Sequence, residues 1–165
     1  MIIVQDTREK EPWQLTTFAE CEEQIVKTVS TGDYIIKGKE TLITIDRKKS
    51  PTELANNLGM HIKRFENEME RMQEYTYRYI ICEFPYEKLL KFPYGCGLPK
   101  FLTKRIRVRG KFLIKQAKRL ADKYGVEFIF CASREEAQER AIALFKGALE
   151  NEKQQDSSKL SEVDG

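Results

Sequence analysis

Asp33, Asp46 and Lys48 are polar side chains whose types and spacing could carry out metal-assisted hydrolysis of a phosphodiester. The two carboxylates offer the hard oxygen ligands that Mg²⁺ and Mn²⁺ prefer. An ion held there would polarise the phosphate and lower the pKa of a bound water. A lysine beside the carboxylates could hold that water or neutralise the charge that develops in the transition state.

A predicted β-hairpin brings these three residues together. The runs 34–36 and 42–45 are apolar and β-branched, and a glycine between two lysines supplies a turn between them. Because strand side chains alternate, Asp46 and Lys48 share one face, opposite to the isoleucines of the second strand. Asp33 begins the first strand, so the closed hairpin places it beside the end of the second. We expect the two carboxylates to meet there.

These residues fit the PD-(D/E)xK pattern of restriction-endonuclease-like nucleases, although a solvated hairpin carries the same common residue types. Further residues narrow the choice, because Asp6, Arg8 and Glu9 lie early in the chain and Gly32 precedes Asp33. With Asp46-Arg47-Lys48, they give the chain a resemblance to the XPF-type nuclease domain over about residues 1–150.

The chain departs from that family's pattern at two positions. Asp46 stands where the family usually has glutamate, which shortens the reach to a metal ion. Thr52 stands where the last aspartate of the motif belongs, with Glu53 one position later.

The resemblance implies an α/β, restriction-endonuclease-like three-layer fold with a central mixed β-sheet flanked by helices. It also implies a site that uses Mg²⁺ or Mn²⁺ and cleaves branched or flapped DNA. The metal would be bound by Asp33, Asp46 and the carbonyl of Arg47, with Glu9 and Asp6 in the outer sphere. Lys48 would orient the attacking water, and the side chain of Arg47 would grip the scissile phosphate.

The charge is concentrated in one segment. Nine basic residues and no acidic residue lie between Lys100 and Arg119, whereas the whole chain has a formal net charge of only +3. A basic run without counter-charges favours a polyanion as its partner over a merely solvated face. We expect DNA to contact Arg8, Lys49, Arg64, Arg105, Arg107, Arg109 and Lys111.

The length and composition of the chain limit its domain organisation, its location and the kinds of metal site that it can contain. The 165 residues suit a nuclease domain at 1–150 followed by a polar, disordered tail at 151–165. We expect an intracellular protein, since no apolar run has membrane-spanning length and no signal stretch opens the chain. The four cysteines form no CxxC pair, and His61 is the only histidine, which excludes HExxH sites.

The segments that flank the hairpin predict the rest of the sheet and its helices. A strand is expected at 2–4, another at 24–29, a buried strand at 79–83 and a last strand at 126–131. A single helix should begin after Ser50 and run to Met72, because Pro51 and Glu53 follow a good N-cap. A helix ending near Gly125 should follow the basic run, and another should span 133–149, its apolar stripe serving the core or a dimer contact. The stretch 91–101 is either a connecting loop or a mobile flap.

Two other functions stay open at this point. The chain could be a DNA-binding scaffold that kept the fold and lost catalysis, or a junction-resolving or restriction-like enzyme. We find no tandem helix-hairpin-helix module in the sequence. It is therefore undecided how the DNA structure is selected and whether the chain acts as a homodimer or with a partner subunit.

Overall fold

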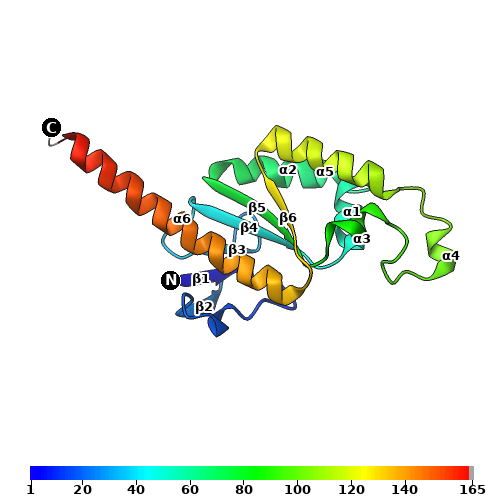
Figure 1. The fold of residues 1–165 in the computed structure, drawn as a ribbon, viewed down its shortest axis with the longest axis horizontal. Helices are drawn as coiled ribbons and strands as arrows, with labels where there is room; N and C mark the ends of the chain where they lie inside the picture. Colours follow the sequence, from blue (N-terminus) through cyan, green and yellow to red (C-terminus); the bar gives the residue numbers. More distant parts are fainter. Residues whose placement is uncertain (164–165) are drawn as a thin grey trace.

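A computed structural model describes the backbone of residues 1–163 and the side chains of residues 1–160 (Figure 1). Its centre is a six-stranded mixed sheet with the order β2-β1-β3-β4-β5-β6. β3 is antiparallel to both β1 and β4, and the other neighbours are parallel. The strands are β1 (Ile2–Gln5), β2 (Glu23–Val26), β3 (Tyr34–Ile36), β4 (Ile43–Lys48), β5 (Tyr77–Cys82) and β6 (Glu127–Phe130).

Helices cover both faces of this sheet and form the outer layers. One face packs against α6 (Arg134–Val163) through a core that contains Ile45 and Phe145. The other face packs against helices through a core that contains Phe65 and Ile80, and Figure 1 shows α2 and α5 on that side. The predicted three-layer α/β fold is therefore confirmed. Its remaining helices are α1 (Pro51–Leu58), α2 (Ile62–Arg71), α3 (Tyr86–Leu90), α4 (Lys100–Thr103) and α5 (Gly110–Tyr124), and 3-10 turns lie at Leu15–Thr17 and Met72–Glu74.

The predicted hairpin is present and has the expected register. Tyr34 in β3 pairs with Ile45 in β4, and the Asp33 amide donates to the Ile45 carbonyl at 2.8 Å. Gly38 turns the chain between the strands with a φ of 78°, in the left-handed region that glycine adopts without a steric cost. The carboxyl end of β4 therefore lies beside the start of β3.

The single helix predicted from Ser50 to Met72 is in fact two helices. Its beginning is as predicted, since the Glu53 amide donates to Ser50 Oγ at 3.2 Å and Pro51 occupies the first turn. The helix is interrupted at Gly59, whose φ of −106° and ψ of −97° are not helical. Glycine inside a helix costs about 1 kcal/mol relative to alanine, which makes it a natural place for the break.

The prediction of a disordered tail is wrong for residues 151–163, because α6 continues without interruption to Val163. The first half of α6 is anchored in the core, and extending an existing helix costs far less than nucleating one. Contacts to the body also hold the second half, since Asn151 donates to the Tyr77 hydroxyl at 3.2 Å and Lys39 lies 2.6 Å from Glu152. Residues 164–165 lie outside the described part of the chain. The domain boundary at residue 150 stays a prediction.

Within residues 1–163, no helix combines the length and the apolar character needed to cross a lipid bilayer. The stripe of α6 that was assigned either to the core or to a dimer contact serves the core, since Ala137, Ala141 and Phe145 are buried against the sheet.

Candidate active site

A polar hollow of about 240 Å³ opens at the carboxyl end of β4, against α1 and α2. The strand contributes its last three residues, and the two helices contribute side chains from the opposite wall. Most of its wall is charged, whereas the two main cores on either side of the sheet are apolar. The lining residues are Glu9, Asp33, Asp46, Arg47, Lys48, Glu53, Asn57, His61, Arg64, Phe65 and Glu68.

The two predicted carboxylates meet in this hollow. The register of the hairpin places Asp33 beside Asp46, and Asp33 Oδ2 accepts a hydrogen bond from the Arg47 amide at 2.7 Å. Burial and the neighbouring charge of Asp46 raise the pKa of Asp33 to about 9. Two carboxylates this close and this desolvated do not both ionise readily without a compensating cation.

Lys48 supplies a positive charge on the same face. Its Nζ lies 2.7 Å from Asp46 Oδ2 and 5.0 Å from the centre of the Phe65 ring, and the side chain is buried. Burial alone would lower the pKa of Lys48, but the charges of Asp46 and Glu68 outweigh burial and raise that pKa. Lys48 is therefore a fixed cation, suited to donating hydrogen bonds and stabilising negative charge rather than to accepting a proton.

The donor atoms of this hollow fit a hard divalent cation. Among the residues that the structure describes, Asp46 Oδ2 is a buried oxygen without a hydrogen bond, and its contact with Lys48 is only an ion pair. Asp33 faces the same space, and hard cations such as Mg²⁺ are usually held by one or two carboxylates while they keep several waters. No group of three or more His, Cys, Asp or Glu side chains with metal-site geometry occurs in the described part of the chain. Asp33 and Asp46 are the residues that would hold such an ion.

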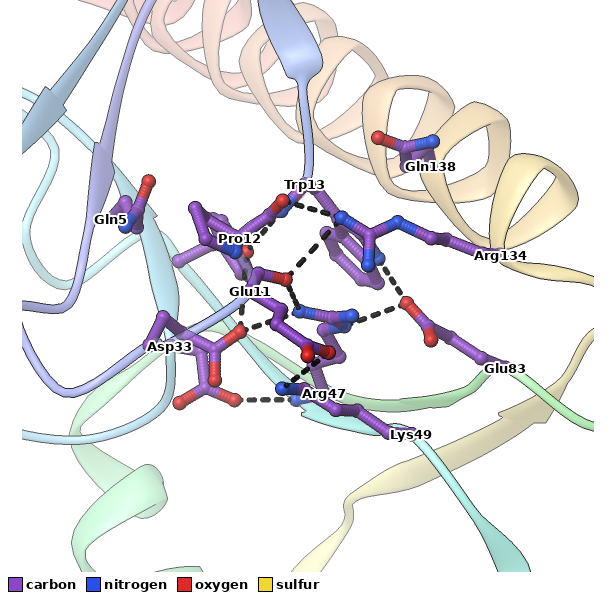
Figure 2. A network of polar contacts seen from close by, with 12 residues as sticks. Gln5, Glu11, Pro12, Trp13, Asp33, Arg47, Lys49, Glu83, Arg134 and Gln138 are labelled. Carbon is purple, nitrogen blue, oxygen red and sulfur yellow. Dashed lines mark hydrogen bonds and ion pairs between the residues drawn. The ribbon is translucent and has the colours of Figure 1, made fainter.

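Arg47 extends toward the carboxylates of Glu9 and Glu83, although its buried Nη2 makes no hydrogen bond within the described part of the chain. Its Nη1 donates to Glu9 Oε2 at 2.8 Å and its Nε donates to Glu83 Oε1 at 2.6 Å, as part of the network in Figure 2. The guanidinium lies 5.5 Å from the centre of the Trp13 ring, and its side chain is only 1% exposed. Arg47 still lines the hollow beside Asp46 and Lys48, and its expected role in gripping a phosphate stays a prediction. In this structure Arg47 positions Glu9.

The two early acidic residues have different places. Glu9 lines the hollow, where Arg47 and the Tyr34 hydroxyl, at 3.4 Å, hold one of its oxygens. Asp6 is buried outside the hollow and binds Arg8, with distances of 2.5 Å to Nη2 and 2.8 Å to the backbone amide. Burial would raise the pKa of Asp6, but the hydrogen bonds and charge of Arg8 outweigh burial and lower it. The prediction that Asp6 belongs to the metal site is not supported by this arrangement, since Arg8 already takes up its carboxylate.

The fold can be compared with solved structures. XPF from Aeropyrum pernix superimposes with a TM-score of 0.62 at 20% sequence identity, over 87% of this chain and 64% of that chain. The chain has the fold of XPF. A structure of XPF from Aeropyrum pernix in complex with DNA gives a TM-score of 0.60 at 20% identity, over 92% of this chain and 64% of that chain. The chain thus spans slightly less than two thirds of the length of these XPF chains. No protein-family model and no curated protein sequence matches it.

On this XPF-type fold, the predicted DNA contacts fall into two groups. Arg64 lines the hollow, and Arg8 is exposed over 71% of its side chain although it also holds Asp6. Lys49 is half-buried, 3.4 Å from Glu11. The other predicted contacts lie outside the hollow on the exposed segment that leads into α5, namely Arg105, Arg107, Arg109 and Lys111.

Several residues of the site were not predicted from the sequence, among them Glu68 and Glu83. Glu68 on α2 lines the hollow, and burial together with the charge of Asp46 raises its pKa. Its position four residues after Arg64 places both on one helix face, which is the signal that could have identified it. Glu83 follows β5 directly, and the parallel pairing of Lys48 with Cys82 brings it to the same edge of the sheet.

Glu53, the residue after Thr52, has a different role from the aspartate that the family carries at position 52. Thr52 lies outside the residues that line the hollow, whereas Glu53 is among them. One oxygen of Glu53 accepts a hydrogen bond from the Lys49 amide at 2.8 Å, which fixes the start of α1. Glu53 is therefore a capping residue that also borders the site.

Proposed function

We propose that this protein is a Mg²⁺- or Mn²⁺-dependent DNA endonuclease that hydrolyses phosphodiester bonds. The observation that carries the proposal is the meeting of Asp33, Asp46 and Lys48 in one buried polar hollow at the end of β4. The XPF-type fold supports it, because the same pattern of residues underlies the resemblance of the sequence to XPF-type nucleases.

The bound cation would polarise the scissile phosphate and lower the pKa of a water. Asp33 and Asp46 would hold it, and its charge would offset the repulsion between the two carboxylates. The Lys48 ammonium donates a hydrogen bond to the attacking water or to the oxygen on which negative charge develops, which favours the transition state. Arg47 and Glu83 keep Glu9 at the wall of the hollow, so that the site is rigid before DNA arrives.

The proposed substrate is DNA with a flap, fork or branch, in repair, recombination or replication. The exposed basic residues before and within α5 would bind the phosphate backbone, and the structure of XPF from Aeropyrum pernix in complex with DNA supports DNA as the polymer. We further propose that the protein acts inside the cell. Action as a homodimer or with a partner subunit would supply DNA contacts beyond this chain.

A second candidate is a DNA-binding scaffold that has lost catalysis. The observation in its favour is that Thr52 replaces a carboxylate and lies outside the hollow. The retained Asp33, Asp46 and Lys48 argue against it, because a scaffold has no need for three charged residues in a desolvated hollow. A junction-resolving or restriction-like nuclease would use the same site on other DNA.

Cleavage of end-labelled flap, fork, four-way and plain duplex DNA, each with Mg²⁺, Mn²⁺ or EDTA, separates these functions. The proposal predicts metal-dependent cutting of flap or fork DNA that exceeds cutting of the plain duplex. Preferred cutting of the four-way substrate would indicate a junction resolvase, and binding without cutting of any substrate would indicate the scaffold. Glu139→Gln, which changes an exposed carboxylate on α6, is the matched control and should cut like the wild type.

A further inference from the structure

A second hollow, of about 400 Å³, lies between the end of α3 and the start of α5, outside the active site. Its walls are almost entirely apolar. Tyr94 is 55% exposed beside it, and the Arg109 guanidinium lies 5.8 Å from the centre of the Tyr94 ring.

The base of this hollow is fixed by tight packing. The Gly110 amide donates to the Phe92 carbonyl at 3.1 Å, and Phe92 itself is buried. A Cβ atom on Gly110 would lie 2.0 Å from the Leu90 carbonyl oxygen, so only glycine permits this approach. The start of α5 is therefore held against the end of α3, and the apolar floor exists before any ligand binds.

The rim of the hollow is exclusively basic. Lys91, Arg109 and Lys111 border it, and the sequence contains no acidic residue between Glu87 and Asp122. Charge complementarity therefore favours a polyanion with flat apolar groups. Single-stranded nucleic acid has this chemistry, since its bases stack on aromatic rings while its phosphates bind cations.

The segment that carries this rim also reaches the active-site wall. Val108 lies 3.9 Å from the position that a Cβ on Gly59 would take. Gly59 forms the break between α1 and α2, and His61, just after the break, lines the catalytic hollow. Val108, which precedes Arg109 of the rim, therefore lies close to Gly59, two residues before His61 of the catalytic hollow.

We propose that the hollow beside Tyr94 binds an unpaired base of single-stranded DNA, with Arg109 and Lys111 on the flanking phosphates. The choice of DNA rests on the proposed nuclease function. An unpaired arm held here gives the enzyme a preference for DNA with a single-stranded arm over plain duplex.

Binding of a short fluorescein-labelled oligo(dT) and of a duplex of equal length, measured by anisotropy in EDTA with the full chain, tests this proposal. Tyr94→Leu keeps an apolar side chain without a flat ring and should weaken oligo(dT) binding on the order of tenfold, with a change of about twofold or less for the duplex. Tyr94→Phe keeps the ring and should bind like the wild type. Tyr86→Leu removes another exposed aromatic ring, 42% exposed and outside this hollow, and should also bind like the wild type.

Unchanged oligo(dT) binding in Tyr94→Leu, or an equal loss in Tyr86→Leu, would overturn the proposal. Competition by poly-glutamate that depends equally on Tyr94 would also overturn it, since it would indicate a site for an acidic peptide. Because binding is measured without a metal ion, the result is independent of cleavage. If the protein cuts no DNA but only Tyr94→Leu loses oligo(dT) binding, the proposed nuclease activity is refuted and the proposed binding site is not.

Discussion

The Arg47 guanidinium donates to Glu9 at 2.8 Å on the face of β4 opposite to Lys48, its neighbour in the chain. One strand end thus serves two purposes through simple alternation. Asp46 and Lys48 face the polar hollow, whereas Arg47 lines it and also packs against Trp13, where it ties the loop after β1 to Glu83 at the end of β5. We expect Arg47 to support the site by holding Glu9 in place.

Arg47→Ala should destabilise the protein by about 3–5 kcal/mol, because it leaves the half-buried carboxylates of Glu9 and Glu83 without the cation that pairs with both. The measurement is urea unfolding at neutral pH. Arg119→Ala breaks a half-exposed ion pair with Glu66 and should cost less than about 1 kcal/mol. Equal effects of the two substitutions would contradict the supporting role of Arg47.

The carboxyl pair should make the metal-free protein less stable at alkaline pH. Asp33 has a pKa of about 9 in the folded protein, whereas an unfolded aspartate titrates near 4, so the folded state binds the extra proton between these values. Stability should therefore fall as the pH rises through this range. Asp33→Asn should remove most of this dependence and, at pH 8 in EDTA, melt at least about 2–4 °C above the wild type. Melting curves at pH 5 and pH 8 provide the test. An Asp33→Asn variant that is less stable than the wild type at pH 8 would show that the carboxylates of Asp33 and Asp46 do not destabilise the protein.

A bound divalent cation should restore the stability that the crowded carboxylates of Asp33 and Asp46 cost at alkaline pH. At a Mn²⁺ concentration of about 100 times Kd, the wild type should gain about 2.7 kcal/mol from binding to the folded state alone. Asp46→Asn removes one of the two ligands and should gain much less. Thermal unfolding with and without Mn²⁺ measures the difference, with Glu139→Gln as the control. An identical shift in Asp46→Asn would show that the ion binds elsewhere.

Glu68 should contribute to ion binding although it lies on α2, away from the sequence motif. It faces Asp46 and Lys48 across the hollow, and supporting carboxylates of this kind commonly change metal affinity by about 10–100-fold. Glu68→Gln should weaken Mn²⁺ binding by about tenfold in isothermal titration. Glu70→Gln, on the exposed face of the same helix, should leave the Mn²⁺ affinity unchanged. Equal Mn²⁺ affinities of the two variants would show that Glu68 does not contribute to ion binding.

The sequence predicted the features that depend on local patterns. Strand alternation and a glycine turn were sufficient to place Asp33 beside Asp46, and the N-cap at Ser50 was correct. The place of Asp6 was missed although its contact is local, because the amide and the guanidinium of Arg8, two residues later, both bind its carboxylate.

Long-range pairing hid other parts of the site. Glu83 belongs to the site only because β5 lies parallel to β4, a fact of topology. Glu68 was not identified from the sequence, and the helix that carries it was predicted to continue from Ser50 through Gly59 without a break. Residues 151–163 are helical because they extend the part of α6 that is packed in the core. The composition of the tail alone does not reveal that support.

Asp46 and Lys48 are expected to act in cleavage and not in DNA binding. Single-turnover cleavage of labelled flap DNA in Mn²⁺ should be compared for the wild type, Asp46→Asn and Lys48→Met, with DNA affinity measured in parallel. Each substitution should slow cleavage by at least about 10²-fold while DNA affinity stays close to that of the wild type. Cleavage by either variant at the wild-type rate would show that these side chains are not part of the catalytic site.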